Sequence, residues 1–251
     1  MIVSIIMPAY NSAATISTSI LSVISQNFNS WELLIIDDFS SDNTKSIIQK
    51  FSKYDSRIKL LSNLENKGPA YCRDLGISNS LGEYIAFLDS DDIYYPNKLD
   101  KQLSWMLKSN IEISYHSYDI IDSCGIKLKT IDCSIEILNY RNIHYIRNLG
   151  FCLTFVIKKS LIENIKFSDT SYQIAEDYLF FSSLLKKKNA YKAPLILAAY
   201  RNYTGSRSSN KILAAFYILY IYLYKENLNP FIAIFYWFLY IFHSIKNRLP
   251  S

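Results

Sequence analysis

The fold is decided by the stretch Tyr84-Ile85-Ala86-Phe87-Leu88-Asp89-Ser90-Asp91-Asp92, an apolar run that ends in three carboxylates within four residues. The apolar half predicts a buried strand. Alternation along a strand would place Asp89 and Asp91 on one face and Asp92 on the other. Carboxylates crowded at the end of a buried strand repel each other, and a hard divalent cation is their natural counter-charge. A solvated acidic turn is the alternative.

Strand-like and helix-like segments alternate through the first half of the chain. Strands are predicted at 3–7, 33–36, 58–61 and 84–88, and helices at 15–24, 44–51, 68–80 and 96–108. The strands are apolar on both faces, which is typical of parallel strands covered by helices on both sides. The pattern therefore predicts an α/β fold with a Rossmann-like, mostly parallel sheet.

Three of the predicted strands end in polar residues, namely Tyr10-Asn11, Asp37-Asp38 and the acidic cluster 89–92. Right-handed crossovers bring the carboxyl ends of parallel strands to one edge of the sheet. Ligands of such sheets bind at that edge. The convergence of three polar strand ends therefore predicts a binding site there.

The second half is less regular. Strands are predicted at 111–121, 151–157 and 195–200, followed by a basic loop at 201–209. A helix is expected after Glu176-Asp177, with acid at its start and three lysines at its end, as suits a helix dipole. We interpret 1–110 as a nucleotide-binding half, 111–210 as an acceptor half, and 211–251 as a separate helical tail.

The distribution of charge and the spacing of the cysteines disfavour some classes of function. Residues 1–200 carry 21 basic and 21 acidic side chains, whereas 201–251 have a net charge of +5. This concentration favours a partner for the tail over general nucleic-acid binding. The four cysteines form no C-x-x-C pair, which predicts free thiols in a reducing compartment without a zinc site. The amino terminus has no basic segment with a cleavage site, so we expect no signal peptide.

The tail contains two apolar blocks, 213–224 and 228–242, that are rich in Tyr, Phe and Trp. Each is shorter than the roughly 18–20 residues that span a bilayer. Aromatic blocks with basic flanks favour helices that lie on an anionic membrane surface. Packing against the catalytic domain is the alternative. Deletion of 211–251 should release a soluble protein if the tail is an anchor, and cause aggregation if it is part of the core.

Four motifs, taken together, resemble the family 2 glycosyltransferases, which have the GT-A fold. Each is weak alone, but their order and spacing match from residue 1 to about 210. The motifs are Val3-Ser4-Ile5-Ile6-Met7-Pro8-Ala9-Tyr10-Asn11, Ile36-Asp37-Asp38-Phe39-Ser40-Ser41-Asp42-Asn43-Thr44, Asp89-Ser90-Asp91-Asp92 and Glu176-Asp177.

The resemblance implies a nucleotide pocket lined by Pro8, Tyr10 and Asn11. Asp38 would accept a hydrogen bond from the uracil ring of a UDP-sugar. Arg73 stands where the family has a basic contact to the nucleotide.

The resemblance also implies the chemistry of the acidic residues. Asp89 would bond the ribose or the sugar. Asp91 would bind Mn²⁺ or Mg²⁺ at the diphosphate, with Asp92 as a further metal ligand. Asp177 would be the general base, and Glu176 beside it would orient the acceptor. A single base with direct displacement inverts the configuration of the sugar.

The sequence departs from the family pattern at two positions. Arg73 is followed by Asp74 where the family often has Asn, and Tyr203 stands where it often has His. The Gln-x-x-Arg-Trp motif of processive synthases is absent, which favours transfer of a single sugar.

The first interpretation is therefore an inverting, metal-dependent transferase that moves one sugar from a UDP-sugar to a lipid-linked saccharide. The acceptor would carry a polyprenyl diphosphate, in bacterial surface polysaccharide synthesis. The enzyme would lie peripherally on the cytoplasmic face of the inner membrane. There are two alternatives. The enzyme could transfer the sugar onto a polyprenyl phosphate itself, or the protein could be a non-catalytic membrane protein that binds sugar nucleotides. A nucleotidyltransferase is disfavoured because no Gly-rich loop follows the first strand.

Overall fold

The structure, a computed structural model, describes residues 2–146, 149–168, 176–202 and 211–246. In this part of the chain ten strands form one sheet, with the main order β3-β2-β1-β4-β9-β6-β10-β5. The strands are β1 (Val3–Ala9), β2 (Trp31–Asp37), β3 (Ile58–Ser62), β4 (Tyr84–Phe87), β5 (Ile93–Tyr94), β6 (Ile113–Ile121), β7 (Lys127–Ile131), β8 (Ile137–Leu138), β9 (Val156–Lys158) and β10 (Ala190–Arg201). The α-helices are α1 (Ile16–Ile24), α2 (Thr44–Tyr54), α3 (Gly68–Asn79), α4 (Lys98–Lys108), α5 (Phe151–Thr154), α6 (Glu176–Lys187), α7 (Lys211–Tyr220) and α8 (Pro230–Lys246).

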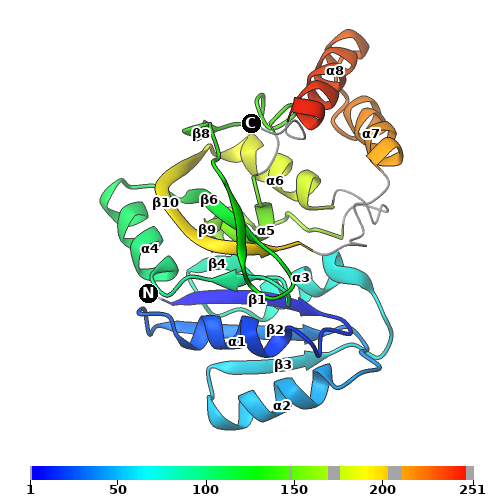
Figure 1. Cartoon of the computed structure of the whole chain (residues 1–251). Coiled ribbons are helices and arrows are strands. Elements are labelled where there is room, and N and C mark those ends of the chain that lie inside the picture. The colour runs from blue at the N-terminus through cyan, green and yellow to red at the C-terminus, as the bar shows by residue number, and fades with distance from the viewer. Residues whose placement is uncertain (1, 147–148, 169–175, 203–210, 247–251) are drawn as a thin grey trace.

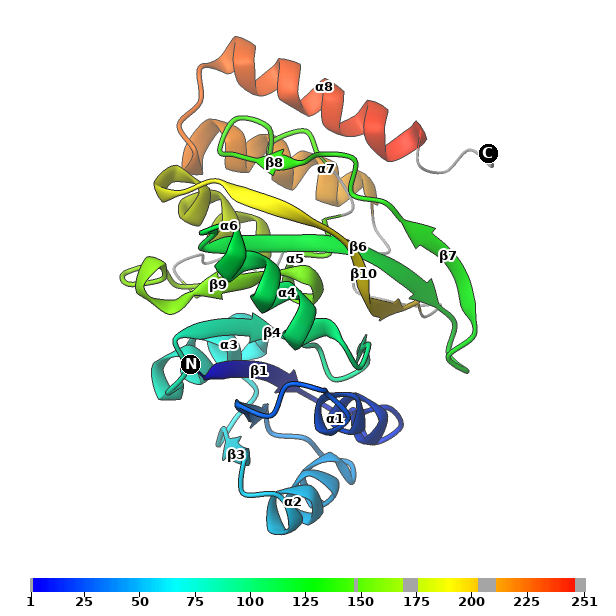
Figure 2. The ribbon, with the colours of Figure 1, turned by 90° about the vertical axis from the view of Figure 1, so that its left-hand side faces the viewer.

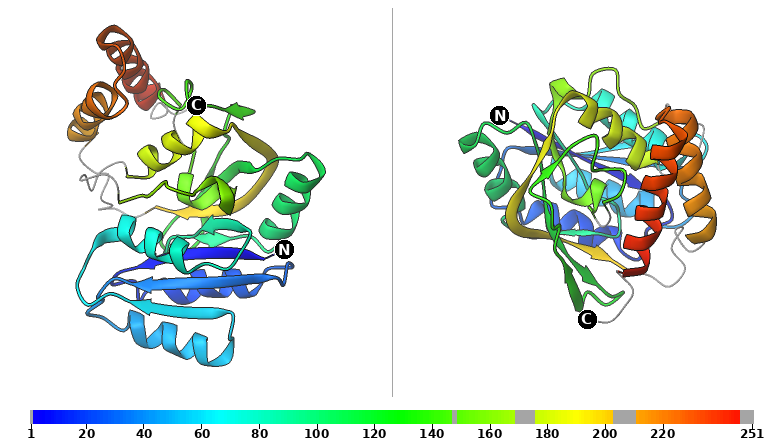
Figure 3. Two further views of the ribbon diagram at one scale, coloured as in Figure 1. Left: turned by 180° about the vertical axis from the view of Figure 1, so that it is seen from behind. Right: turned by 90° about the horizontal axis from the view of Figure 1, so that it is seen from above.

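The first four strands confirm the predicted parallel arrangement. β3, β2, β1 and β4 all run in the same direction. Every residue of β1 and β2 is buried, as expected for strands covered on both faces. Figure 1 shows α1 on one face of these strands, and the view from behind in Figure 3 shows α3 on the other. The α/β fold class predicted from the alternating pattern is therefore confirmed.

The second half of the sheet is mixed. β9 runs antiparallel to both β4 and β6, β10 runs parallel to β6, and β5 runs antiparallel to β10. Because β5 belongs to the predicted nucleotide-binding half and β10 to the acceptor half, the two halves share one sheet.

The predicted strand at 151–157 is wrong in its first part. Residues Phe151–Thr154 form the short helix α5, and only Val156–Lys158 enter the sheet as β9. Gly150 precedes α5 with φ of 56°, and its carbonyl accepts hydrogen bonds from the backbone N–H of Leu153 and of Thr154. A short apolar run cannot be assigned to helix or strand from its periodicity alone.

The side chain of Lys98 in α4 is buried. It has no exposed surface, its Nζ donates to Gln102 Oε1 at 2.7 Å, and it lies 4.5 Å from the centre of the Tyr94 ring. Burial lowers the pKa of Lys98 from 10.5 to about 7. The folded protein therefore favours the neutral amine.

This burial predicts a pH-dependent stability. Between the folded pKa of about 7 and the unfolded pKa of 10.5, the unfolded chain binds one more proton, so the free energy of unfolding rises with pH. Relative to Lys98→Met, the wild-type free energy of unfolding should rise by about 1.4 kcal/mol per pH unit across this window. Urea titrations of both proteins at about pH 7.5 and 9.5 measure the difference. Identical pH dependence of the two proteins would contradict the buried, neutral Lys98.

The tail packs on the domain with one side and exposes aromatic side chains on the other. α7 continues into the π-helical turn η3 (Ile221–Lys225), and α8 follows. Figures 1 and 2 show α7 and α8 at the end of the molecule opposite α2. Within the described ranges, no helix combines the length and the apolar character needed to cross a membrane.

Candidate active site

The loops that follow β1, β2 and β4 meet at the carboxyl edge of the sheet, as the sequence predicts. Asn11 Oδ1 accepts a hydrogen bond from the backbone N–H of Ser41 at 2.9 Å, which joins the first two loops. Ser12 Oγ lies 2.7 Å from Ser90 Oγ, and Thr15 Oγ1 donates to the Ser90 carbonyl at 3.0 Å. These bonds hold the acidic segment 89–92 against the start of α1.

The three residues expected to line a nucleotide pocket differ in their exposure. Pro8 is buried within β1, where it pairs with Ile36 of β2. Tyr10 is 47% exposed and Asn11 is also exposed, with a left-handed φ of 47°. Tyr10 and Asn11 therefore present surface to a ligand at this edge, whereas Pro8 shapes the strand beneath them.

Asp38 is buried and organises the loop before α3. Its Oδ1 accepts hydrogen bonds from Asn63 Nδ2 at 2.7 Å and from the backbone N–H of Lys67 at 2.9 Å. Its Oδ2 accepts one from the backbone N–H of Gly68 at 2.8 Å. The Cys72 thiol is also hydrogen-bonded to this carboxylate, so groups of the protein itself occupy its roughly four acceptor positions. Contact between Asp38 and uracil stays a prediction.

The acidic segment is a turn and not the end of a strand, so the predicted strand geometry is wrong, although Asp89 and Asp91 are still grouped apart from Asp92 as predicted. β4 ends at Phe87, where its pairing with β1 also ends, and the backbone N–H of Asp92 donates to the Asp89 carbonyl at 3.1 Å. Asp92 is 2% exposed, while Asp89 and Asp91 are partly exposed. The segment therefore presents Asp89 and Asp91 to solvent and buries Asp92.

Arg73 joins the acidic turn after β4 to the start of α6. It is buried in α3, and its Nη2 lies 2.8 Å from Asp89 Oδ1. Its Nη1 lies 3.8 Å from Glu176 Oε1 at the start of α6. The sequence predicted a divalent metal ion as the counter-charge of the acidic segment. The guanidinium of Arg73 neutralises part of this negative charge.

Arg201 is a residue of this site that sequence reasoning assigned to the tail. It ends β10, is 5% exposed, and its backbone N–H donates to Asp92 Oδ1 at 2.8 Å. Its Nε donates to the Asp91 carbonyl at 2.9 Å, and its Nη1 donates to the carbonyls of Asp122 and Ser123. Arg201 thus binds the acidic turn through hydrogen bonds to Asp91 and Asp92. Its positive charge, counted above with that of residues 201–251, therefore lies at the candidate site.

The negative charges of Asp91 and Asp92 are disfavoured in the folded protein. Burial raises the pKa of Asp91, and the neighbouring charge of Asp89 raises it further. Burial and the charge of Asp91 raise the pKa of Asp92 as well. Among the described residues no group of three His, Cys, Asp or Glu side chains is arranged to hold a metal ion. Mg²⁺ is often held by one or two carboxylates together with substrate phosphates, so Asp91 fits a metal whose other ligands come from a diphosphate.

Glu176 and Asp177 occupy the first turn of α6, as predicted, and both are half-buried. The Asp177 Oδ1 accepts a hydrogen bond from the backbone N–H of Tyr178 at 2.7 Å. Burial raises the pKa of Asp177, and the charge of Arg73 acts in the opposite direction. A carboxylate with a raised pKa is a stronger base than an exposed one, which suits proton abstraction from a hydroxyl.

The tail contacts the helix that carries this acidic pair. Glu226, directly after η3, accepts hydrogen bonds from Lys186 Nζ at 2.6 Å, Tyr140 Oη at 2.7 Å and Ser182 Oγ. Ser182 and Lys186 both belong to α6. The described part of the tail is therefore bound to α6 through the buried carboxylate of Glu226.

A second link between the tail and α6 passes through His144. Its Nδ1 is hydrogen-bonded to the hydroxyl of Tyr178, the residue after Asp177, and its carbonyl accepts a bond from Tyr222 Oη of η3. The ring of Tyr236 in α8 stacks on His144 at 5.1 Å. The predicted departure at Tyr203 lies outside the described residues.

The comparisons with known proteins agree with this geometry. The profile of Glycosyl transferase family 2 matches residues 4–165. Over 213 residues the chain is 43% identical to "UDP-Glc:alpha-D-GlcNAc-diphosphoundecaprenol beta-1,3-glucosyltransferase WfgD" of Escherichia coli, covering 84% of this chain and 81% of that protein. It is 34% identical to "Putative teichuronic acid biosynthesis glycosyltransferase TuaG" of Bacillus subtilis, covering 99% and 98% of the two chains.

Solved structures show the same fold. The crystal structure of S. aureus TarS 1–349 in complex with UDP-GlcNAc superposes with a TM-score of 0.70 at 20% identity, covering 89% of this chain and 67% of that one. Against the longer TarS chain the match spans 40% of its length.

The sheet order and the similarity to TarS define the GT-A fold. The chain belongs to glycosyl transferase family 2. The resemblance drawn from the four sequence motifs is therefore confirmed.

Proposed function

We propose that this glycosyltransferase moves a single sugar from a UDP-sugar to a saccharide linked to a polyprenyl diphosphate, with inversion, during surface polysaccharide synthesis. The observation that carries the proposal is the bridge of Arg73 between Asp89 and Glu176. It joins a donor-side carboxylate to the helix that carries the candidate base. The names of the WfgD and TuaG relatives support this donor, this acceptor class and this pathway.

In the proposed reaction the acceptor hydroxyl attacks the anomeric carbon and gives its proton to Asp177. The bond between that carbon and the diphosphate breaks, and UDP leaves with the bonding electron pair. Asp89 would hold the ribose or sugar, Tyr10 and Asn11 the nucleotide, and Asp91 a divalent cation. Bound Mg²⁺ or Mn²⁺ would stabilise the charge that grows on the diphosphate oxygens.

A donor and acceptor screen tests the proposal. The purified protein is incubated with Mn²⁺ or Mg²⁺, a panel of UDP-sugars, and a synthetic GlcNAc-diphospho-lipid or the matching polyprenyl phosphate. We expect one UDP-sugar to extend the diphosphate-linked saccharide by one residue, with inverted anomeric configuration in the product. Transfer onto the bare polyprenyl phosphate, a retained configuration, or no transfer from any UDP-sugar would each contradict the proposal.

We also propose that the tail binds the cytoplasmic face of the membrane that carries the acceptor. Its outer side exposes apolar aromatic rings, and the exposed Lys225 lies among them. Aromatic rings and basic side chains together suit an anionic membrane interface. In the described part of the tail the exposed rings are those of Phe216, Tyr220, Tyr224, Phe231, Phe235, Phe238 and Phe242.

The membrane proposal predicts binding to anionic vesicles that salt weakens but does not abolish, because apolar burial is not screened. Replacing the exposed Phe231 and Phe235 with Ser should reduce flotation strongly and leave thermal unfolding unchanged, since neither ring is buried. Exposed Leu64 and Leu81, replaced with Ser, provide the control with apolar surface elsewhere. Absence of flotation by the folded wild type at low salt would contradict membrane binding.

Deletion of 211–251 is a poorer test than the sequence suggested. It would remove Tyr222 and Glu226, which are buried against the domain, along with the exposed rings. Point substitutions on the outer side separate membrane binding from folding.

A further inference from the structure

Asp74, the residue that departs from the family pattern, does not face the donor site. Adjacent residues on an α-helix point about 100° apart, so Asp74 is turned away from the direction of Arg73. Its Oδ1 accepts a hydrogen bond from the backbone N–H of Phe167, and its Oδ2 accepts one from Ser168, both at 2.8 Å. Both carboxylate oxygens therefore hold a segment more than 90 residues later in the chain.

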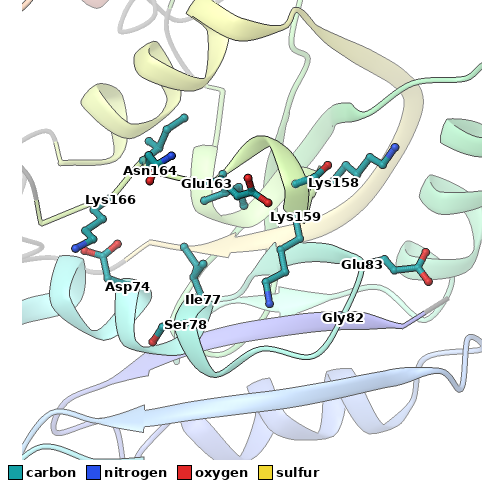
Figure 4. A pocket seen from close by; sticks show the side chains of 13 residues that line it. Asp74, Ile77, Ser78, Gly82, Glu83, Lys158, Lys159, Glu163, Asn164 and Lys166 are labelled. Atoms are coloured by element: carbon teal, nitrogen blue, oxygen red, sulfur yellow. The ribbon is translucent and has the colours of Figure 1, made fainter.

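Asp74 also borders a surface pocket of about 510 Å³ between α3 and the segment after β9. Figure 4 shows Asp74 of α3 at one end of this pocket, close to Lys166, with Lys166 and Glu163 on the facing segment after β9. The mixed charges of its lining residues define no ligand. The pocket shows that Asp74 lies on the side of α3 that faces the segment after β9.

Phe167, which Asp74 fixes through its backbone, lies at the centre of the domain. Its side chain is fully buried, and its ring stacks on Phe180 of α6 with 3.8 Å between the ring centres and 8° between the planes. Its ring also meets the edge of Phe87 at the end of β4, at 5.4 Å. The guanidinium carbon of Arg73 lies 5.4 Å from the centre of the same ring.

Phe180 and Glu176 are four residues apart on α6, so they share one face of that helix. The stack of Phe167 on Phe180 therefore helps to fix the orientation of α6 about its axis. That orientation directs Glu176 toward Arg73. Asp177 is the next residue and moves with the same helical turn.

We propose that Asp74 is a positioning residue for the acidic pair of α6. It fixes Phe167, and Phe167 sets α6 against β4 and Arg73, so that Glu176 and Asp177 face the donor carboxylate Asp89. Arg73 and Asp74 thus hold α6 at two points. Arg73 pairs with the charge of Glu176, and Asp74 acts through the stack of Phe167 on Phe180. This inference rests on the proposed function for the catalytic role of α6.

The test compares Asp74→Ala, Asp74→Asn and Phe167→Leu with Glu163→Gln, a control that changes an exposed carboxylate lining the same pocket. We expect Asp74→Ala to lower kcat by about tenfold or more, because small misplacements of a catalytic group are costly. The UDP-sugar Kd by calorimetry should stay within about twofold, since the donor residues are untouched. Asp74→Asn keeps one acceptor oxygen and should lose less.

Phe167→Leu keeps an apolar core side chain but removes the ring stack, so it should reproduce the loss of kcat with the donor Kd retained. Hydrogen exchange at the backbone amides of residues 178–184 should accelerate in both Asp74→Ala and Phe167→Leu, measured where circular dichroism shows full folding. The control should match the wild type in every measurement.

The outcomes separate this inference from the proposed function. If Asp177→Asn is inactive while Asp74→Ala and Phe167→Leu keep wild-type kcat, the positioning role is wrong and the proposed function stands. If Asp74→Ala weakens donor binding as much as kcat, Asp74 serves the donor and the inference is also wrong. If Asp177→Asn retains turnover, the proposed function fails first.

Discussion

Replacing Asp177 with Asn is expected to lower kcat by about 10²–10⁴-fold, the usual contribution of a general base. The amide cannot accept the proton of the acceptor hydroxyl, but it keeps the size and the oxygen that accepts the Tyr178 N–H. The Kd for the UDP-sugar should therefore be nearly unchanged in calorimetry. Lost donor affinity with retained turnover would show that Asp177 serves the donor.

The pH dependence gives a second measurement of the same residue. A base acts only when deprotonated, and burial raises the pKa of Asp177, so wild-type kcat should fall with acid at a higher pH than for an exposed carboxylate. The residual activity of Asp177→Asn should lack this acid limb. Asp100→Asn, in the first turn of α4, is the matched control and should keep both the rate and the pH profile.

Replacing Asp91 with Asn is expected to remove at least about 99% of the activity, because a metal ion at the diphosphate supplies several kcal/mol to the transition state. The fold should not suffer. The charge of Asp91 is disfavoured by burial and by Asp89, so its neutral replacement should leave the midpoint of thermal unfolding unchanged or raise it. Lost activity without lost stability distinguishes a ligand from a structural carboxylate.

Metal removal completes this test. Excess EDTA should abolish wild-type transfer, and added Mn²⁺ or Mg²⁺ should restore it. Full activity in excess EDTA would rule out the metal role of Asp91. Partial activity of Asp91→Asn that rises with metal concentration is the expected sign of a weakened site.

The first half of the fold and the location of the site follow from local sequence patterns. Apolar runs that are buried on both faces specify parallel strands, and the topology then brings Asn11, Asp38 and Asp89 to one edge. This prediction needs only periodicity and the handedness of crossovers. Glu176 and Asp177 were placed correctly at a helix start because their charges suit the helix dipole.

The contacts between distant segments were not predictable from the same patterns. Arg201 and Asp92 are 109 residues apart, and nothing local distinguishes Arg201 from the other basic residues near the tail. The same holds for the bonds from Asp74 to residues 167 and 168. The sequence left open whether the tail lies on a membrane or packs on the domain, because composition does not reveal that Glu226 is buried against α6.

The unbroken sheet limits how this enzyme can move. Backbone pairs between β4 and β9, and between β5 and β10, join the first half of the chain to the second. A hinge between two rigid domains would break these ladder hydrogen bonds, whereas movements of surface loops would not. Substrate-linked motion should therefore be confined to loops at the carboxyl edge. A change of donor or acceptor during evolution would likewise be expected to alter those loops and to leave the angle between the two halves unchanged.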